Sequence, residues 1–181
     1  MIVAITGTPG VGKTSVSEFL QDKGYNIIDL NKIINENDFV TGFDEKRDSK
    51  LVDLEKINQF ILKNYQAKEL IFIESHLSHS LECIDKVILL RLHPNNLKKH
   101  LYKKGWKEEK IKENLEAEVL DVILCDIVDN YKESDIFEID TTDKSIETIG
   151  NIIIDIAENN FENMKSYKIG NIDWSEEILN L

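Results

Sequence analysis

The feature that most constrains this chain is a glycine-rich loop that directly follows a short apolar run. Residues 1–6 read MIVAIT, and an apolar, β-branched run of this length predicts a buried parallel strand. Residues 7–14 read GTPGVGKT and match the pattern G-x-x-x-x-G-K-S/T. A helical pattern begins near Gly12 and ends at Gly24. A strand, a loop of this pattern and a helix in succession form the setting that a phosphate-binding P-loop requires.

The residue types of this loop suit the triphosphate of ATP and its Mg²⁺ ion. Glycines let backbone N–H groups turn inward around phosphate oxygens, and the N-terminus of the following helix attracts anions. We expect Lys13 to reach the β and γ phosphates and the Thr14 hydroxyl to bind Mg²⁺. The Ser15 hydroxyl could contact the α phosphate or simply face solvent.

Downstream of the loop, short apolar runs alternate with helical patterns. We predict strands at residues 25–29, 69–73, 86–91 and 136–139, a polar loop at residues 38–50 and one long amphipathic helix at residues 108–131. The alternation predicts an α/β fold, a five-stranded parallel sheet with helices on both faces. Ligands of such sheets bind beyond the carboxyl ends of the strands. We therefore expect the site where these loops meet: residues 7–14, 29–50, 74–80 and 140–144.

A carboxylate and a histidine follow the third predicted strand. Glu74 ends that strand, where a P-loop enzyme usually places a carboxylate on a Mg²⁺-bound water, although the usual residue is Asp. His76 could orient a water or touch the γ phosphate, or it could be a loop histidine that hydrogen-bonds only backbone groups. We favour a functional role for Glu74 and His76, and we interpret His79 as structural.

Two charged segments are candidates for mobile parts of the site. Residues 103–106, KKGW, lie between two predicted helices and suit a small lid that shields phosphoryl transfer from water, although a plain surface turn would show the same pattern. After the second strand, Asp44, Asp48 and Asp53 surround Arg47. Arg47 is the natural bidentate clamp for the phosphate of an acceptor nucleotide, whereas the acidic residues are typical of a solvated charge run.

Length and composition exclude several other classes. A chain of 181 residues fits a single domain. The formal net charge of −12 disfavours broad nucleic-acid binding, because the phosphate backbone is also negative. No apolar run approaches the roughly 18 residues of a membrane-spanning helix, and no signal peptide is visible before the first strand. Cys83 and Cys125 form no metal-binding pattern, so we expect a reducing cytoplasm.

Several segments together resemble the archaeal and nuclear adenylate kinase family, a group of small nucleoside monophosphate kinases that also act as ribosome assembly factors. The segments are GTPGVGKT, GFDEKRDSKLVD, ESHLSHSL, KKGWKEEKIKENLEAEVLDVIL and DTTDKS. The resemblance covers nearly the whole chain, so it is more specific than the P-loop alone.

This resemblance implies both an architecture and a cellular role. It implies a nucleoside monophosphate-binding region at about residues 30–53 and a lid at about residues 103–113. It also implies ATPase activity and a part in late maturation of the small ribosomal subunit, through transient binding of a small-subunit platform protein. In the polar tail at about residues 164–181, Ile172 and Trp174 could join that interface or pack against the body.

The same resemblance assigns individual residues. It places ATP contacts on these residues of the loop: Gly10, Gly12, Lys13, Thr14 and Ser15. Lys144 matches a contact on the base side of ATP, and Lys104 stands where the family has a lid arginine. Lysine keeps the charge but loses the planar fork of arginine. Glu74 and His76 match the family's carboxylate-x-histidine pair, with Glu in place of Asp.

We interpret the chain as an adenylate kinase-like enzyme, ATP + AMP ⇌ 2 ADP, with side ATPase activity. The acceptor is AMP or another nucleoside monophosphate, and Lys13, Arg47 and Lys104 neutralise phosphoryl charge, with Arg91 as a further candidate. One alternative is a kinase of another small metabolite on the same scaffold. A second is an ATP-switched assembly factor with negligible monophosphate kinase activity. The acidic charge predicts direct binding of a basic small-subunit platform protein and weak binding of naked RNA.

Overall fold

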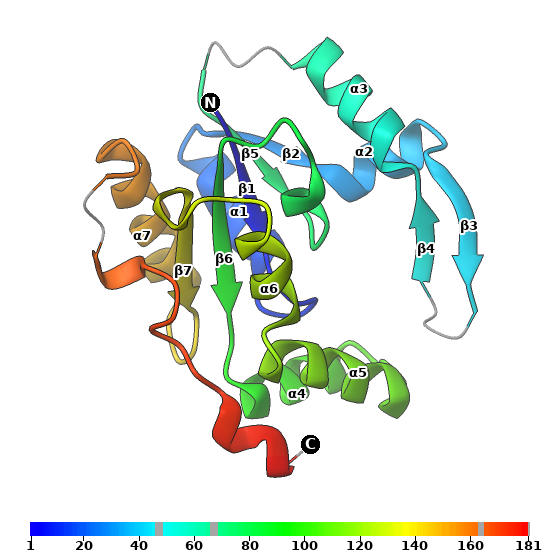
Figure 1. Cartoon of the computed structure of the whole chain (residues 1–181), viewed down its shortest axis with the longest axis vertical. Coiled ribbons are helices and arrows are strands. Elements are labelled where there is room, and N and C mark those ends of the chain that lie inside the picture. Colours follow the sequence, from blue (N-terminus) through cyan, green and yellow to red (C-terminus); the bar gives the residue numbers. More distant parts are fainter. Residues whose placement is uncertain (46–48, 66–68, 163–164, 181) are drawn as a thin grey trace.

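The computed structural model describes residues 1–45, 49–65, 69–162 and 165–180, and a parallel sheet lies at its centre (Figure 1). The strands of the sheet are β1 (Ile2–Thr6), β2 (Asn26–Asp29), β5 (Ile71–Glu74), β6 (Lys86–Arg91) and β7 (Ile136–Asp140). Their order is β2-β5-β1-β6-β7, and every neighbouring pair is parallel. The predicted α/β fold with a five-stranded parallel sheet is therefore confirmed.

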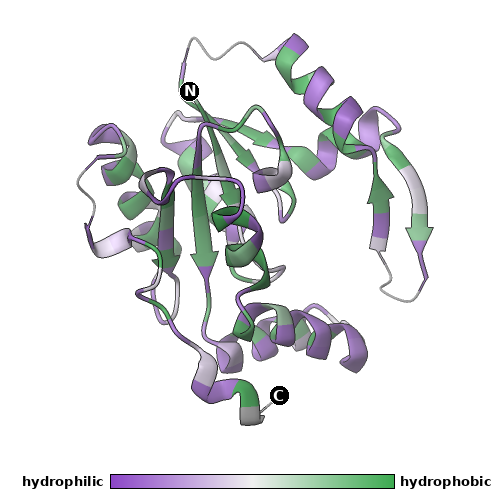
Figure 2. Ribbon diagram, in the orientation of Figure 1, coloured by the Kyte–Doolittle hydropathy of each residue, from purple (hydrophilic) through white to green (hydrophobic). Residues whose placement is uncertain are grey.

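The strands are largely apolar because helices cover both faces of the sheet. β1 reads IVAIT, and all five of its residues are buried. Its side chains alternate between two hydrophobic cores: Val3 and Ile5 enter one, and Ile2 and Ala4 enter the other. Figure 2 shows hydrophobic residues concentrated in the central strands. Burial on both faces explains why these segments form continuous apolar runs in the sequence.

The helices divide between the two cores. The first core takes side chains from α1 (Lys13–Asp22), α4 (Pro94–Lys103), α5 (Glu108–Val119) and α7 (Ile146–Glu158). The second takes side chains from α2 (Leu30–Glu36), α3 (Leu54–Asn64) and α6 (Val122–Val128). Short 3-10 helices lie between other elements and in the C-terminal tail: η1 (Ser78–Ser80), η2 (Glu133–Asp135), η3 (Lys165–Tyr167) and η4 (Ser175–Asn180). Figure 1 places α4 and α5 beyond the end of β6, at the carboxyl edge of the sheet.

Within residues 38–50, which we expected to form a polar loop, the described residues include strand residues of a second, antiparallel sheet. Its strands are β3 (Val40–Asp44) and β4 (Ser49–Val52), in which Phe43 pairs with Lys50. Figure 1 shows these strands standing apart from the central sheet, opposite α5. The loop prediction was wrong because Phe43 and Leu51 are about half exposed, so cross-strand pairing rather than burial in a core stabilises the strands.

Residues 108–131, which we expected to form one helix, contain two. α5 ends at Val119 and α6 begins at Val122, because Asp121 between them adopts a left-handed conformation with φ 55°. The Asp121 carboxylate accepts a hydrogen bond from the buried guanidinium of Arg91. The helical periodicity of the sequence gives no sign of this tertiary contact, which holds the chain at the break.

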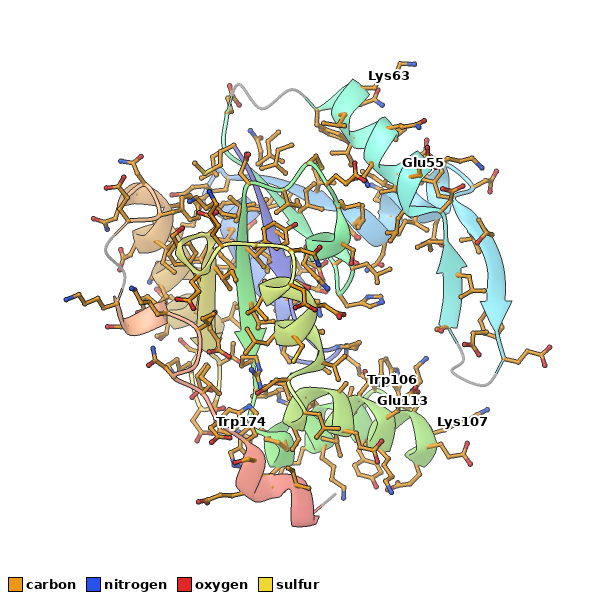
Figure 3. The ribbon with its side chains drawn as sticks, in the orientation of Figure 1. Glu55, Lys63, Trp106, Lys107, Glu113 and Trp174 are labelled. Atoms are coloured by element: carbon orange, nitrogen blue, oxygen red, sulfur yellow. The ribbon has the colours of Figure 1, made fainter. Side chains whose placement is uncertain are left out.

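The described part of the C-terminal tail packs against the body near the start of α4 (Figures 1 and 3). The ring of Trp174 meets that of His93 edge-on, with 4.9 Å between ring centroids. His93 is the N-cap of α4, where its Nδ1 accepts a hydrogen bond from the Asn95 N–H at 3.2 Å. Packing against the body, one of the two roles expected for Trp174, is therefore the role that the structure shows.

Candidate active site

The P-loop joins β1 to α1 and requires glycine at two positions. Gly7 has a φ of +138°, and a Cβ there would lie 2.3 Å from the carbonyl oxygen of Leu90 on β6. Gly10 has a φ of +103°, and a Cβ there would lie 2.9 Å from the side chains of Leu97 and Leu101 on α4. The loop is therefore pressed against β6 and α4, and only glycine permits both the conformation and the close approach.

Lys13 begins α1 and folds its ammonium group back into the loop. The residue is 7% exposed, and its Nζ donates to the carbonyl oxygens of Gly7 at 2.7 Å and Thr8 at 3.2 Å. Burial lowers the pKa of Lys13 to about 8, while the carboxylate of Glu74 acts in the opposite direction. Lys13 therefore stays mostly protonated at pH 7 and keeps a positive charge beside the backbone of the loop.

Glu74 and Thr14 supply oxygen atoms beside Lys13. Glu74 is the buried last residue of β5, the strand next to β1. Burial raises the pKa of Glu74, and the charge of Lys13 opposes that rise. Thr14, the second residue of α1, is exposed.

These donors fit a Mg²⁺ ion that arrives with a nucleotide. Hydroxyl and carboxylate oxygens are ligands that Mg²⁺ accepts, with phosphate oxygens and waters completing its shell. Among the described residues, no three His, Cys, Asp or Glu side chains are arranged to hold a metal ion. Thr14 and Glu74 together would leave most of a Mg²⁺ coordination shell to phosphate and water oxygens.

A cleft of about 580 Å³ runs along the P-loop, and we call it the donor cleft. The structure brings the residues predicted for ATP and catalysis together in its lining, apart from Arg47: Gly10, Gly12, Lys13, Thr14, Ser15, Glu74, His76, Lys104 and Lys144. Lys103 and His100 of α4 lie in the same lining. Cationic side chains from the P-loop, α4 and the segment after β7 thus converge on one space, although Lys144 lies 40 residues or more from the others in the sequence.

The two histidines after β5 have different surroundings. The His76 side chain is exposed at the cleft, but the adjoining protein desolvates its charged form and Lys13 repels it, so its pKa falls to about 4. His76 is therefore neutral at pH 7 and able to orient a water or accept a hydrogen bond. His79 is buried, and its Nδ1 lies 2.9 Å from Thr6 Oγ1. These contacts agree with a structural role for His79.

The turn between α4 and α5 carries the residues predicted to form a lid. Lys104 is exposed, and its Nζ lies 6.0 Å from the ring centroid of Trp106. Lys110 of α5 approaches the same ring, with its Nζ 4.7 Å from the centroid. Lys144 faces the carboxylate of Asp140 at 3.9 Å between Nζ and Oδ2. Lys104 and Lys144 are thus exposed in the lining of the cleft, and neither has an ion pair shorter than 3.9 Å with a described residue.

A second cleft has a volume of about 790 Å³. Residues of β4 and α2 form one of its walls, and residues of α5 form the opposite wall. We call it the acceptor cleft. It shares Pro9, Asn31 and His76 with the donor cleft. Most of its wall is apolar, and its polar members include the following residues: Asn35, Ser49, Lys50, Lys110, Glu113 and Asn114. Figure 3 shows Trp106 and Glu113 on the side of α5 that faces the β3–β4 strands.

The sequence did not single out several of these lining residues. Lys50 lies in the acceptor cleft, where its Nζ donates to Asn35 Oδ1 at 2.5 Å. Asn31 lines both clefts, and its Oδ1 lies 3.5 Å from the Ser75 hydroxyl oxygen. Their only signal was membership of the loop region 29–50 at the carboxyl edge of the sheet. Arg47, the predicted phosphate clamp, lies outside the described residues.

Arg91, a further candidate for charge neutralisation, has a different role. Its side chain is 2% exposed and lies in a buried ion network at the end of β6. Nε donates to Glu118 Oε1 at 2.8 Å, and Nη1 donates to Glu138 Oε1 at 2.7 Å. A guanidinium enclosed by carboxylates is not available to a phosphoryl group, so the prediction for Arg91 was wrong. The sequence placed it at the correct edge of the sheet but could not show which way its side chain points.

A parallel sheet, a P-loop at the end of β1 and a cationic cleft along that loop define a P-loop nucleotide-binding protein. Among the described residues, no helix combines the length and the apolar character needed to cross a membrane.

Comparisons with known proteins place the chain more narrowly. The AAA domain family matches residues 3–121. A protein of Methanosarcina barkeri named "putative adenylate kinase" is 45% identical over 185 residues, covering 98% of this chain and all of that protein. A protein of Methanocaldococcus jannaschii with the same name is 38% identical over 178 residues, covering 98% of this chain and 94% of that protein. The chain belongs to the family of these archaeal proteins.

A solved structure agrees on the fold. Thymidylate kinase from Candida albicans superposes with a TM-score of 0.55 and 15% sequence identity, covering 88% of this chain and 91% of that one. At this identity the likeness concerns the fold alone.

Proposed function

We propose that the chain is a nucleoside monophosphate kinase of the adenylate kinase type, which transfers the γ-phosphoryl group of ATP to AMP. The observation that carries this proposal is the meeting of the donor and acceptor clefts at Pro9, Asn31 and His76, beside the P-loop. A kinase must bring two substrates to one point, whereas an ATPase needs only water there. The names of the archaeal relatives support the same assignment.

In this proposal the P-loop binds ATP and stabilises the charge of its phosphates. The Nζ of Lys13 exchanges the carbonyl oxygens of Gly7 and Thr8 for anionic phosphate oxygens, which are stronger acceptors. Thr14 and, through a water, Glu74 would hold Mg²⁺, which neutralises phosphate charge. The bond between the γ phosphorus and its bridging oxygen breaks as an acceptor phosphate oxygen attacks in line, and no covalent intermediate with the protein is needed.

The acceptor cleft has the groups that a nucleoside monophosphate requires. Lys50 and Lys110 supply positive charge within its described lining. Trp106 offers a flat ring, and Asn114 offers an amide, for recognition of a base. Arg47, three residues before Lys50 in the sequence, remains our predicted clamp for the acceptor phosphate.

We further propose that the two sides of the acceptor cleft close over bound substrates. Residues 30–53 form the monophosphate-binding region and residues 103–113 the lid, and Lys104 of the lid reaches the phosphates of ATP. Gly105, at φ +71°, lies in the turn between α4 and α5 and is open on its Cβ side. Closure would exclude water and so favour transfer to AMP over hydrolysis.

We also propose side ATPase activity and a part in maturation of the small ribosomal subunit, in the reducing cytoplasm. The net charge of −12 favours a basic protein partner, such as a small-subunit platform protein, over naked RNA. The alternative role, an ATP-switched assembly factor with negligible monophosphate kinase activity, makes the same binding prediction but a different kinetic one.

One assay separates these functions. ADP formation from Mg-ATP is measured with AMP, with other nucleoside monophosphates, with small alcohol acceptors and with no acceptor, and Lys13→Met serves as the control for contaminating kinase. We expect AMP to raise ADP formation at least tenfold above the acceptor-free rate. A rate that no monophosphate raises would contradict the kinase assignment, and stimulation by an alcohol alone would favour a small-metabolite kinase.

A pull-down with a purified basic platform protein tests the assembly role. We expect binding at low salt, because opposite net charges attract the two proteins and speed their encounter. The binding should weaken as the salt concentration rises, because salt screens this attraction. Repeating it with ATP and with ADP shows whether the nucleotide state changes the affinity. Absence of binding at low salt in every nucleotide state would leave a metabolic kinase as the better assignment.

A further inference from the structure

Thr8 belongs to the P-loop, but its side chain points away from the donor cleft. The residue is 2% exposed, and its hydroxyl donates to Glu118 Oε2 at 2.5 Å. Glu118 lies 110 residues further along the chain, near the end of α5. The P-loop is thus tied to a helix that forms one wall of the acceptor cleft.

Glu118 is itself held firmly by other partners. Its second carboxylate oxygen, Oε1, accepts from Arg91 Nε at 2.8 Å and from the Leu92 N–H at 3.2 Å. Its backbone carbonyl accepts from Arg91 Nη2 at 3.0 Å. Arg91 also binds Glu138 and Asp121, the residue at the break between α5 and α6. The bond to Thr8 is therefore one arm of a buried network, in which paired charges are strongly oriented.

The backbone of Thr8 leads directly to the proposed phosphate-binding lysine. Its carbonyl oxygen accepts from Lys13 Nζ at 3.2 Å and from the Val11 N–H at 3.3 Å. A displacement of Glu118 would therefore shift the peptide group that holds Lys13 and turns the loop. On the same helix, Asn114 and Ala117 line the acceptor cleft. One face of α5 thus meets the acceptor while Glu118 meets the donor loop.

We propose that Glu118 is a positioning residue that couples α5 to the P-loop through Thr8, so that a monophosphate in the acceptor cleft and ATP on the P-loop strengthen each other's binding. This inference rests on the proposed function for the identity of the acceptor. The coupling itself needs only that both sites favour the same placement of α5. Glu118 touches neither substrate in this scheme and acts through Thr8 alone.

The test removes the hydroxyl of Thr8 and keeps its shape. Thr8→Val breaks the bond to Glu118 and leaves the contact between Glu118 and Arg91 in place. Thr8→Ser retains a hydroxyl and should retain the coupling. Thr6→Val is the matched control, because Thr6 is also buried on the same segment but its hydroxyl pairs with His79 rather than with α5.

Two measurements are made on each variant. The dissociation constant of a non-hydrolysable ATP analogue with Mg²⁺ is determined by calorimetry with and without saturating AMP. We expect AMP to tighten the analogue at least about fivefold in the wild type, the lower end of usual coupling, and less than twofold in Thr8→Val. Amide hydrogen exchange of residues 111–120 is measured with and without the analogue alone, and we expect analogue-induced protection in the wild type and Thr6→Val but not in Thr8→Val.

The outcomes separate this inference from the proposed function. If AMP does not bind the wild type, the acceptor assignment fails, and the exchange measurement, which needs no acceptor, still decides the coupling. Equal coupling and equal α5 protection in the wild type and Thr8→Val would overturn the inference. If Thr8→Val does not fold, Glu118→Gln, which keeps the size of the side chain, is tested in its place. A uniform loss in Thr6→Val as well would mean that any lost buried hydrogen bond has this effect, and would also overturn it.

Discussion

Replacement of Arg91 by Met should destabilise the fold far more than replacement of Lys86, a partly exposed cation on the same strand. Arg91 is 2% exposed, and the side chains of two of its partners, Glu118 and Glu138, are 2% and 0% exposed. Methionine fills much of the same volume but supplies no charge. Arg91→Met therefore leaves carboxylates buried without their cation, which is the costly way to disrupt a buried ion network.

The magnitude follows from that imbalance. Removing one partner of a buried ion pair costs about 3–5 kcal/mol of unfolding free energy. For a chain of 181 residues, where each 1 kcal/mol shifts the melting temperature by about 2–4 °C, the expected decrease is about 6–20 °C. Burial already raises the pKa of Glu138 with Arg91 present. In Arg91→Met this carboxyl should bind a proton more readily when folded than when unfolded, so the deficit should shrink as the pH is lowered from 8 towards 5.

Urea denaturation followed by circular dichroism measures both the loss and its pH dependence. The matched control is Lys86→Met, at the other end of β6, because the Lys86–Asp135 ion pair is partly exposed. We expect Lys86→Met to cost no more than about 1 kcal/mol. Adding Glu138→Gln to Arg91→Met should recover part of the loss by removing buried negative charge. If Arg91→Met and Lys86→Met are equally stable, the argument from burial is refuted.

Three further predictions concern the candidate active site. Lys13→Met should lower ADP formation at least about 100-fold while the protein stays folded. Because burial lowers the pKa of Lys13 to about 8, the ligand-free wild type should gain stability relative to this variant as the pH rises from 8 to 10.5. Denaturation at several pH values measures this gain. Lys104→Ala should raise the KM for ATP and change the unfolding free energy by no more than about 0.5 kcal/mol. Lys104→Arg should preserve or raise activity. Unchanged kinetics in Lys104→Ala would exclude Lys104 from the site. Because the pKa of His76 falls to about 4, the pH profiles of kcat for the wild type and His76→Asn should run parallel from pH 5 to 8, and an inflection near pH 6.5 in the wild type alone would contradict a neutral His76.

Local patterns were enough for the central sheet and the P-loop. A strand buried on both faces is largely apolar, so β1, β6 and β7 stand out in the sequence without knowledge of their neighbours. Periodicity failed where tertiary contacts override it. It missed the β3–β4 pair, whose apolar residues are half exposed, and it ran α5 and α6 together.

Residues gathered from distant parts of the chain were the hardest part of the site to predict. Lys13, Thr14 and Glu74 were within reach, because a P-loop and a strand end have fixed relations in a parallel sheet. For the acceptor cleft, the family resemblance predicted only a monophosphate-binding region at about residues 30–53 and a lid at about residues 103–113. It did not predict most of the lining residues, because the cleft forms between two groups of elements, β3–β4 with α2 and α5, whose separation no local pattern records. Lys50 illustrates the difference: in the sequence it is one charge among many, and in the structure it lines a cleft.

The sequence by itself was enough to predict a P-loop, because the pattern of residues 7–14 and the strand and helix on either side of it are local features. The structure adds that Gly7 and Gly10 have positive φ angles and no room for a Cβ. The tertiary structure alone decided the fates of two charged residues with similar local surroundings in the sequence. Arg91 ends β6 and Glu74 ends β5, yet the first is enclosed by carboxylates and the second faces the donor cleft. The reason is physical: a charge is placed by the partners that compensate its desolvation, and those partners, Glu118 and Glu138, come from elements that only the fold brings to Arg91.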